Sequence, residues 1–416
     1  MSDQRNGQAT FRDVFRVGEF QALWAALVLS IVGDQLARVA LALLVFARTH
    51  SAALTALTYA LTLLPDLIGG PLLSGLADRF PRREVMVVAD VSRAGLVALM
   101  AIPGMPLALL CVLLVVVQLL ASPFNAARGA VLPSMLGGDA FIAGQAVVNI
   151  TYQTGQLFGY VVGGVIVAFT GTHVALLIDA GTFVASALLV RLGTSTRPPS
   201  HKGDGLPTSQ AKATIAALRA GTDLVWHDRN LRALVGIACI CGFYVIGEGL
   251  AVPYAHELGG GALTAGLLFA AFPAGNALGM IMLLRLVPPE PRLRLLGPMA
   301  IAACAVLLIC FAHPNLVGTL VILALSGAAA SHQTVAAAAF VRAVPDANRG
   351  QAYGLANTSI RVAQGLGVVL AGLAADSVPP SMVVGIFGGV GVLVALAAAT
   401  AYYRARHAVS ITTVEA

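Results

Sequence analysis

The sequence at residues 72–83 reads LLSGLADRFPRR, and it lies where one long apolar run, 52–73, ends and another, 85–102, begins. A helix needs about 20 mainly apolar residues to cross the hydrocarbon core of a bilayer, so each run is long enough to span it. Basic residues gathered between two such runs are typical of a loop at the cytoplasmic membrane surface. We therefore expect this part of the chain to be a pair of membrane helices.

The composition of the whole chain supports the same interpretation. Apolar residues fill 58% of the 416 positions, while Asp, Glu, Lys and Arg fill only 11%, against about 25% in soluble proteins. This composition excludes a water-soluble fold. The net charge of +6 could suit nucleic acid, but the basic residues punctuate the apolar runs and do not gather on one soluble domain. We predict no nucleic-acid partner.

Twelve apolar runs of suitable length follow one another along the chain. They are 20–46, 52–73, 85–102, 107–122, 146–169, 174–192, 231–254, 263–287, 295–312, 316–341, 352–374 and 382–403. We predict an all-α integral membrane protein with twelve transmembrane helices in two pseudo-symmetric six-helix halves. The N-terminal half is 1–192, a cytoplasmic linker with an amphipathic segment is 193–230, and the C-terminal half with a short tail is 231–416. The tripeptide Gly-Gln-Ala at 144–146 recurs at 350–352 and supports the repeat.

The distribution of basic residues predicts the orientation. Of the 25 Lys and Arg residues, all but four lie in segments that fall on one side of the membrane when the spans alternate. The exceptions are Arg48, in a loop on the other side, and Arg38, Arg93 and Arg361, inside spans. Because Lys and Arg hold a loop in the cytoplasm, both termini are predicted to be cytoplasmic.

The charged loop resembles the signature G-x-L-A-D-R-x-G-R-R of the major facilitator superfamily of transporters. The matching residues are Leu76, Ala77, Asp78, Arg79, Arg82 and Arg83, whereas Ser74 and Pro81 replace the two glycines. The resemblance implies two six-helix halves that rock around a midplane substrate cavity, as the general description of this superfamily has it. It also implies that Asp78, Arg79, Arg82 and Arg83 form a cytoplasmic gate between the halves.

A glycine pattern in the fifth span carries a second resemblance. Gly155, Gly159, Gly163 and Gly164 resemble the antiporter-type motif of the superfamily, without its proline. Generic close packing of helices is the alternative explanation, because small residues at this spacing let two membrane helices approach. The segments around Arg128 and Arg349 are similar to the macrolide and enterobactin exporter branch, and they are taken as loop motifs. These resemblances favour export over import.

Ionisable residues inside the spans are expensive and need a partner, a wet cavity or a function. Asp34 and Arg38 lie four apart, hence on one helix face, where they can neutralise each other. A structural ion pair and a protonation or substrate-gating role for Asp34 both stay open. Asp90 and Arg93 lie three apart in the third span, and there a structural pair is favoured.

Three further charges lie in apolar surroundings. Asp66, beside Pro65, is a candidate either for proton coupling or for hydrogen-bonded packing. Glu248 is a candidate either for proton coupling or for a vestibule residue that faces water on the outer side. Arg361 should pair across helices with Asp34, Asp66 or Glu248, because no carboxylate accompanies it in its own span. Asp179 is expected to be interfacial.

No enzyme chemistry competes with transport. The five cysteines lie singly or as one C-x-C inside apolar runs, and no Walker loop or nucleophile motif occurs. We predict no enzyme activity, no cofactor and no metal site.

The expected partners are the bilayer, a small-molecule substrate and protons, for a monomeric multi-pass protein of the cell membrane. We predict a secondary transporter that exports small amphipathic organic molecules in exchange for protons by alternating access; an importer or a non-transporting receptor on the same fold is the alternative.

Overall fold

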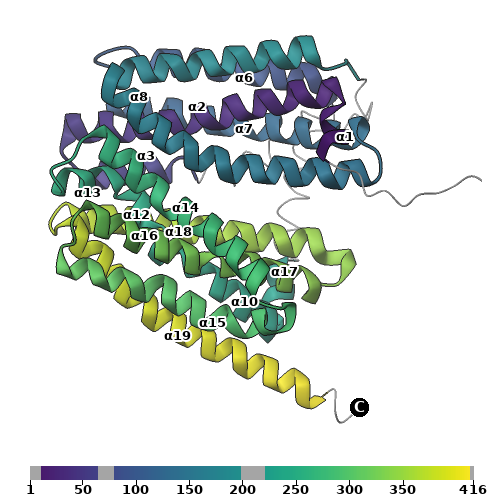
Figure 1. Ribbon diagram of the computed structural model, residues 1–416, viewed down its shortest axis with the longest axis vertical. Coiled ribbons are helices and arrows are strands. Elements are labelled where there is room, and N and C mark those ends of the chain that lie inside the picture. Colours follow the sequence, from purple (N-terminus) through teal and green to yellow (C-terminus); the bar gives the residue numbers. More distant parts are fainter. Residues whose placement is uncertain (1–10, 64–78, 198–220, 413–416) are drawn as a thin grey trace, which may run out of the picture. The chain divides into compact units, whose positions relative to one another are not determined.

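The computed structural model describes residues 11–63, 79–197 and 221–412. Every regular element in these ranges is a helix, as predicted (Figure 1). Contacts group the chain into two compact units: the first contains Met1–Ala40 and Pro65–Gln210, and the second contains Leu41–Leu64 and Ala211–Ala416. The predicted domain division at 193–230 stays a prediction.

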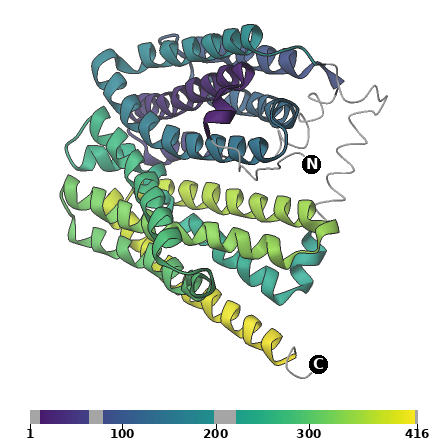
Figure 2. The same ribbon diagram turned by 45° about the vertical axis from the view of Figure 1, so that its right-hand side comes forward.

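The first unit is built from helices, and all but the first of them are long. They are α1 (Phe11–Phe15), α2 (Gly18–Thr49, to Ala40 in this unit), α6 (Arg82–Met100), α7 (Leu107–Met135) and α8 (Asp139–Gly193). Figures 1 and 2 show α2, α6 and the two arms of α8 side by side. The arms meet at Gly171, whose φ of 80° is a conformation that glycine adopts without a steric penalty. The fifth and sixth predicted spans are therefore these two arms.

Helix α7 corrects one sequence prediction. The fourth span was placed at 107–122 and the segment around Arg128 was taken as a loop, but α7 continues through both to Met135. Pro123 and Pro133 lie inside the helix. A proline in a membrane helix removes one backbone hydrogen bond, and neighbouring helices compensate, so it need not end the helix.

The second unit contains more helices, and several of them are short or interrupted. They are α3 (Ala52–Ala60), α10 (Arg229–Cys239), α11 (Cys241–Tyr244), α12 (Ile246–Gly249), α13 (Ala251–Glu257), α14 (Ala262–Leu286), α15 (Pro289–Ala305), η1 (Val306–Ala312), α16 (Leu316–Ala330), α17 (His332–Ala343), η2 (Asp346–Asn348), α18 (Arg349–Ala375) and α19 (Pro380–Thr412). Helix α3 packs on α18, α14 on α16, and α15 on α19. Gly275 and Gly327 lie where the backbones of α14 and α16 touch, which only residues without a Cβ allow.

Nine helices among the described residues are long and apolar enough to cross a membrane. One of them is α8, which carries two predicted spans. Helix α6 has 19 residues but carries several charges, and α3 lies next to residues outside the described ranges. The membrane-spanning character of the chain is confirmed, while the total of twelve spans and the cytoplasmic placement of both termini stay predictions.

The glycine pattern of the fifth span packs α8 against α2. A Cβ atom at Gly159 would lie 2.8 Å from Cβ of Gln35, and one at Gly163 would lie 3.1 Å from Cα of Leu36. Such distances leave no room for a side chain. The close helix approach expected of this pattern is present, and an antiporter role for the motif stays a prediction.

We expect Gly163→Val to lower the free energy of unfolding by about 1–3 kcal/mol, the usual cost of overfilling a packed contact. The matched control is Gly181→Val, in the same helix, because a Cβ there would meet nothing within 4 Å. The control should stay within about 0.5 kcal/mol of the parent. Chemical denaturation in detergent micelles measures both, and equal losses would show that close approach to α2 is not what the glycine provides.

Candidate functional site

Arg93, in α6, lies at the centre of a buried group of charges in the first unit. The residue is 1% exposed. Nη2 donates a hydrogen bond to Oδ1 of Asp34 in α2 at 2.8 Å, and Nη1 lies 3.8 Å from Oδ1 of Asp90. Nη1 also donates to Oγ of Ser30 at 3.4 Å, and the guanidinium lies 4.0 Å from the ring centre of Phe183. Three helices thus converge on one arginine.

A third carboxyl, Asp179 in α8, belongs to the same group. It is 1% exposed, and Thr182 donates to its Oδ1 at 3.2 Å. Its Oδ2 is buried without a hydrogen-bond partner in the described part of the chain. Gly33, next to Asp34, gives Asp179 its room, because a Cβ at position 33 would collide with the Asp179 carboxylate. Asp179 therefore lies next to the residue that precedes Asp34, at the edge of the group around Arg93.

The group holds three carboxyl side chains and one arginine, so it has more acidic than basic side chains. Asp34 and Asp90 share Arg93, Asp179 lies against Gly33 beside them, and Ser186 donates to Oδ2 of Asp90 at 2.5 Å. Carboxylates buried close together cannot all be ionised, because each added negative charge is repelled by the others. The side chain of Asp34 is 25% exposed, whereas that of Asp90 is fully buried. Of these two carboxyl side chains, only that of Asp34 is accessible from outside the packed helices.

The expected pairing of Asp34 with Arg38 is wrong. Asp34 pairs with Arg93, 59 residues away in the sequence, and Arg38 donates from Nη1 to Oε1 of Gln35 at 3.2 Å and to the hydroxyl of Tyr160 at 3.4 Å. The spacing of four puts the two residues on one helix face, but it does not fix where a long arginine side chain extends. The neighbouring helix offers Asp34 a nearer cation.

Glu248 is buried in the second unit. It lies in α12, is 4% exposed, and accepts a hydrogen bond from the hydroxyl of Tyr59 in α3. The ring of Tyr59 stacks on Phe269. The interpretation of Glu248 as a water-facing vestibule residue is therefore wrong, because helices α3 and α14 cover it. A protonation role for this carboxyl stays a proposal.

Arg361, in α18, was expected to pair across helices. Its half-buried side chain makes no hydrogen bond or ion pair with any described residue of the second unit, and its pairing with Asp34 of the first unit stays a prediction. The pairing with Glu248 is therefore wrong, because Glu248 faces Tyr59. Asp66, the third partner considered, lies outside the described residues.

The residues predicted as a cytoplasmic gate are only partly described, because Asp78 lies outside the described residues. Arg82 donates to the carbonyl of Ala130 in α7 at 2.8 Å, and Arg83 to the carbonyl of Thr194 at 3.4 Å. These bonds tie α6 to the ends of α7 and α8. The gate itself stays a prediction.

Two loop-motif arginines have local partners. The guanidinium of Arg128 lies 5.2 Å from the ring centre of Tyr152, and Arg349 forms an ion pair with Asp346 at 2.5 Å. Across residues 11–63, 79–197 and 221–412, no group of three His, Cys, Asp or Glu side chains is arranged to hold a metal ion.

Sequence reasoning missed Asp179. Counting residues from the end of its span placed it near the interface, whereas the structure buries it beside Asp34 and Arg93. The available signal was that any carboxylate inside an apolar run is a functional candidate by default. The position of a residue along a helix does not show on which face of the helix it lies. Asp179 is buried because it lies on a face that packs against a neighbouring helix.

Comparison with known proteins adds independent observations. A family model described as the Major Facilitator Superfamily matches residues 23–325 and 234–414. Multidrug efflux pump Tap of Mycobacterium tuberculosis is 30% identical over 236 residues, 52% of this chain and 52% of that protein. Enterobactin exporter EntS of Citrobacter koseri is 27% identical over 270 residues, 63% of this chain and 62% of that protein. The chain thus spans about half the length of the first relative and under two thirds of the second.

Solved structures resemble the whole fold. The nucleoside transporter NupG superposes with a TM-score of 0.71 at 14% identity, covering 92% of this chain and 99% of that chain. A POT family transporter in complex with 5-aminolevulinic acid superposes with a TM-score of 0.72 at 10% identity, covering 93% and 96%. At these identities the similarity establishes the fold and nothing about the substrate.

Proposed function

The chain belongs to the major facilitator superfamily, and from this premise we propose that it is a proton-coupled exporter of small amphipathic organic molecules. The family makes it a multi-pass transporter of the cell membrane, as the charged loop at 72–83 indicated. Secondary transporters of this fold move substrate by rocking two halves around a central site. Export, proton coupling and the substrate class are the parts that we propose.

The observation that carries proton coupling is the excess of buried carboxyls around Arg93. With Asp34 ionised, its carboxylate holds Nη2 of Arg93 at 2.8 Å. When Asp34 takes up a proton, that charge attraction is lost, and Asp90 and Asp179 become the competing partners of the guanidinium. One protonation at a partly exposed residue would thus change which helices Arg93 ties together, α2 with α6 or α6 with α8. A contact with two arrangements gives protonation a way to shift a conformational equilibrium.

Two observations support export. The glycines at 155, 159, 163 and 164 follow the antiporter-type pattern in a helix packed on α2. The names of the two curated relatives are those of an efflux pump and an exporter. We further propose Glu248 and Asp66 as secondary protonation sites, and Asp78 with Arg79, Arg82 and Arg83 as the cytoplasmic gate.

Inverted membrane vesicles that contain the protein should accumulate a fluorescent amphipathic organic cation when their interior is acidic. Inversion turns the cytoplasmic side outward, so an exporter takes the probe up while protons leave. A protonophore should reduce uptake to the level of vesicles without the protein. Uptake that a protonophore does not change would refute proton coupling. Uptake only by right-side-out vesicles would favour the importer, and no flux across a compound panel would favour the receptor.

A further inference from the structure

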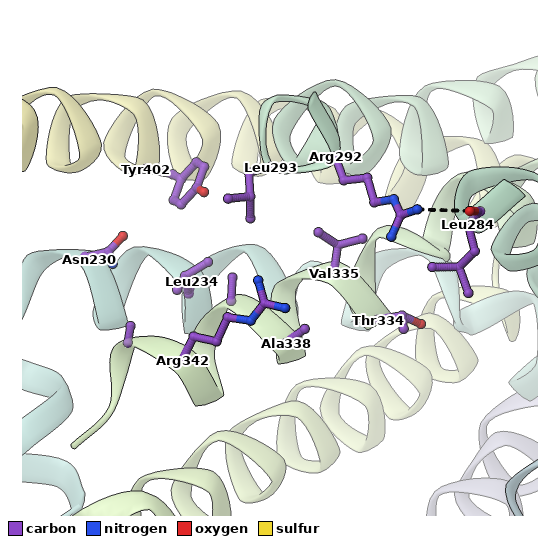
Figure 3. A pocket seen from close by; sticks show the side chains of 12 residues that line it. Asn230, Leu234, Leu284, Arg292, Leu293, Thr334, Val335, Ala338, Arg342 and Tyr402 are labelled. Atoms are coloured by element: carbon purple, nitrogen blue, oxygen red, sulfur yellow. Dashed lines mark hydrogen bonds between the residues drawn. The ribbon is translucent and has the colours of Figure 1, made fainter. Parts of the chain in front are cut away.

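A pocket of about 390 Å³ lies within the second unit, and none of the buried charged residues described above lines it (Figure 3). Helices α10, α14, α15, α17 and α19 all line it. The lining includes Asn230 at the start of α10, Arg292 near the start of α15 and Arg342 at the end of α17. The predicted orientation places these helix ends at the cytoplasmic surface. The pocket therefore lies at the level of the inner lipid headgroups.

The pocket is basic. Arg292 and Arg342 line it, and none of its lining residues, all of which the structure describes, is Asp or Glu. Arg292 is held in place because its Nε donates to the carbonyl of Val287 at 2.8 Å and its Nη2 to that of Leu284 at 2.9 Å. These carbonyls belong to the end of α14. Its Nη1 takes part in neither bond.

Arg342 is the available cation of the pocket. It makes no hydrogen bond or ion pair with any residue in the described ranges, and Figure 3 shows its side chain extending into the pocket from α17. Asp346, the nearest carboxylate along the chain, is taken by Arg349 at 2.5 Å. An arginine in this position presents a planar set of donors that suits a phosphate group.

The rest of the pocket suits a lipid. Leu234, Leu293 and Val335 form apolar wall beside the two arginines. Close by in the chain, Trp226 is 66% exposed and Arg232 lies 5.9 Å from its ring centre. Exposed tryptophan next to arginine is typical of the boundary between lipid tails and headgroups. Basic pockets between membrane helices on the cytoplasmic side are sites where anionic lipid headgroups bind.

We propose that this pocket binds the phosphate of an anionic phospholipid from the inner leaflet, with Arg342 as the main charged contact and Arg292 as the second. The apolar wall would hold the start of the acyl chains. A lipid bound there would tie the ends of α10, α15 and α17 together in one half of the transporter. The proposal goes beyond the transport function and rests on the predicted orientation only for the choice of leaflet.

The test is a binding titration on the full-length protein in detergent, with fluorescent short-chain phosphatidylglycerol as the probe. Arg342→Gln should weaken binding about tenfold, the effect of losing one charge-assisted contact. The matched control is Arg285→Gln, an exposed arginine in the last turn of α14 that does not line the pocket. It should change binding by less than about twofold. Ala338→Phe, which keeps both charges and fills the pocket, should weaken binding as Arg342→Gln does.

Each other outcome overturns the proposal. Equal affinity for phosphatidylcholine would remove the role of charge, and an equal loss in Arg285→Gln would show general surface attraction. If glycerol 3-phosphate displaces the lipid probe with an affinity equal to that of the lipid, the ligand would be a soluble phosphate compound and not a lipid. Binding in detergent needs no transport, so this test fails or succeeds independently of the vesicle experiment.

Discussion

Arg93→Gln should leave little folded protein, with a loss of about 3–5 kcal/mol in the free energy of unfolding, because it removes one partner of a buried ion pair. Asp34 and Asp90 would lose their cation, and Asp179 would remain buried beside them. Fluorescence-detected size exclusion and denaturant unfolding measure the loss. Few single substitutions in the described helices should cost as much, since a change of more than 4 kcal/mol is exceptional.

The matched control for that variant is Arg16→Gln, whose ion pair with Asp13 is exposed to solvent. An exposed pair contributes about 0–1 kcal/mol, so this variant should fold normally. The double variant Asp34→Asn with Arg93→Gln should fold better than Arg93→Gln alone, because it removes one of the stranded carboxylates. If Arg93→Gln by itself is as stable as the parent, the three carboxyls are already neutral and the charge argument for this group is wrong.

Asp34→Asn is expected to fold but to lose gradient-driven transport by a factor of about 100, the lower end of what loss of a proton-transferring side chain costs. Arg93 keeps Asp90 as a partner at 3.8 Å, so no buried charge is left alone. Substrate counterflow, which needs no net proton movement, should persist within about twofold. Proteoliposomes with and without a pH gradient measure the two activities side by side.

Asp139→Asn serves as the control for that experiment, because Asp139 lies exposed in the first turn of α8 and outside the buried group. It should transport normally in both assays. A variant Asp34→Asn that loses counterflow together with driven transport would place Asp34 in substrate binding or in folding. A variant that keeps both would move proton coupling to another carboxyl, and Glu248→Gln would then be the next variant to measure.

Much of the site was within reach of the sequence as a set of candidates. Asp34, Asp90, Arg93 and Glu248 stand out because each is an ionisable residue within an apolar run. The glycines at 155, 159 and 163 also indicated a close helix contact before the partner helix was known. Sequence reasoning failed at α7, where Pro123 and Arg128 looked like a loop and lie inside a helix. The local sequence identifies unusual residues. It does not reveal whether neighbouring helices compensate for a backbone hydrogen bond lost at a proline or for a charge inside a helix.

The sequence by itself determined that this chain spans the membrane as helices and belongs to its family, because hydrophobicity and the charged loop at 72–83 are properties of neighbouring residues. The tertiary structure alone decided the partners. It paired Arg93 with Asp34, buried Asp179 beside them, and brought Tyr59 to Glu248, 189 residues away. The reason is rotational: the sequence sets where a residue lies along a helix, whereas packing against neighbouring helices sets which way that helix faces.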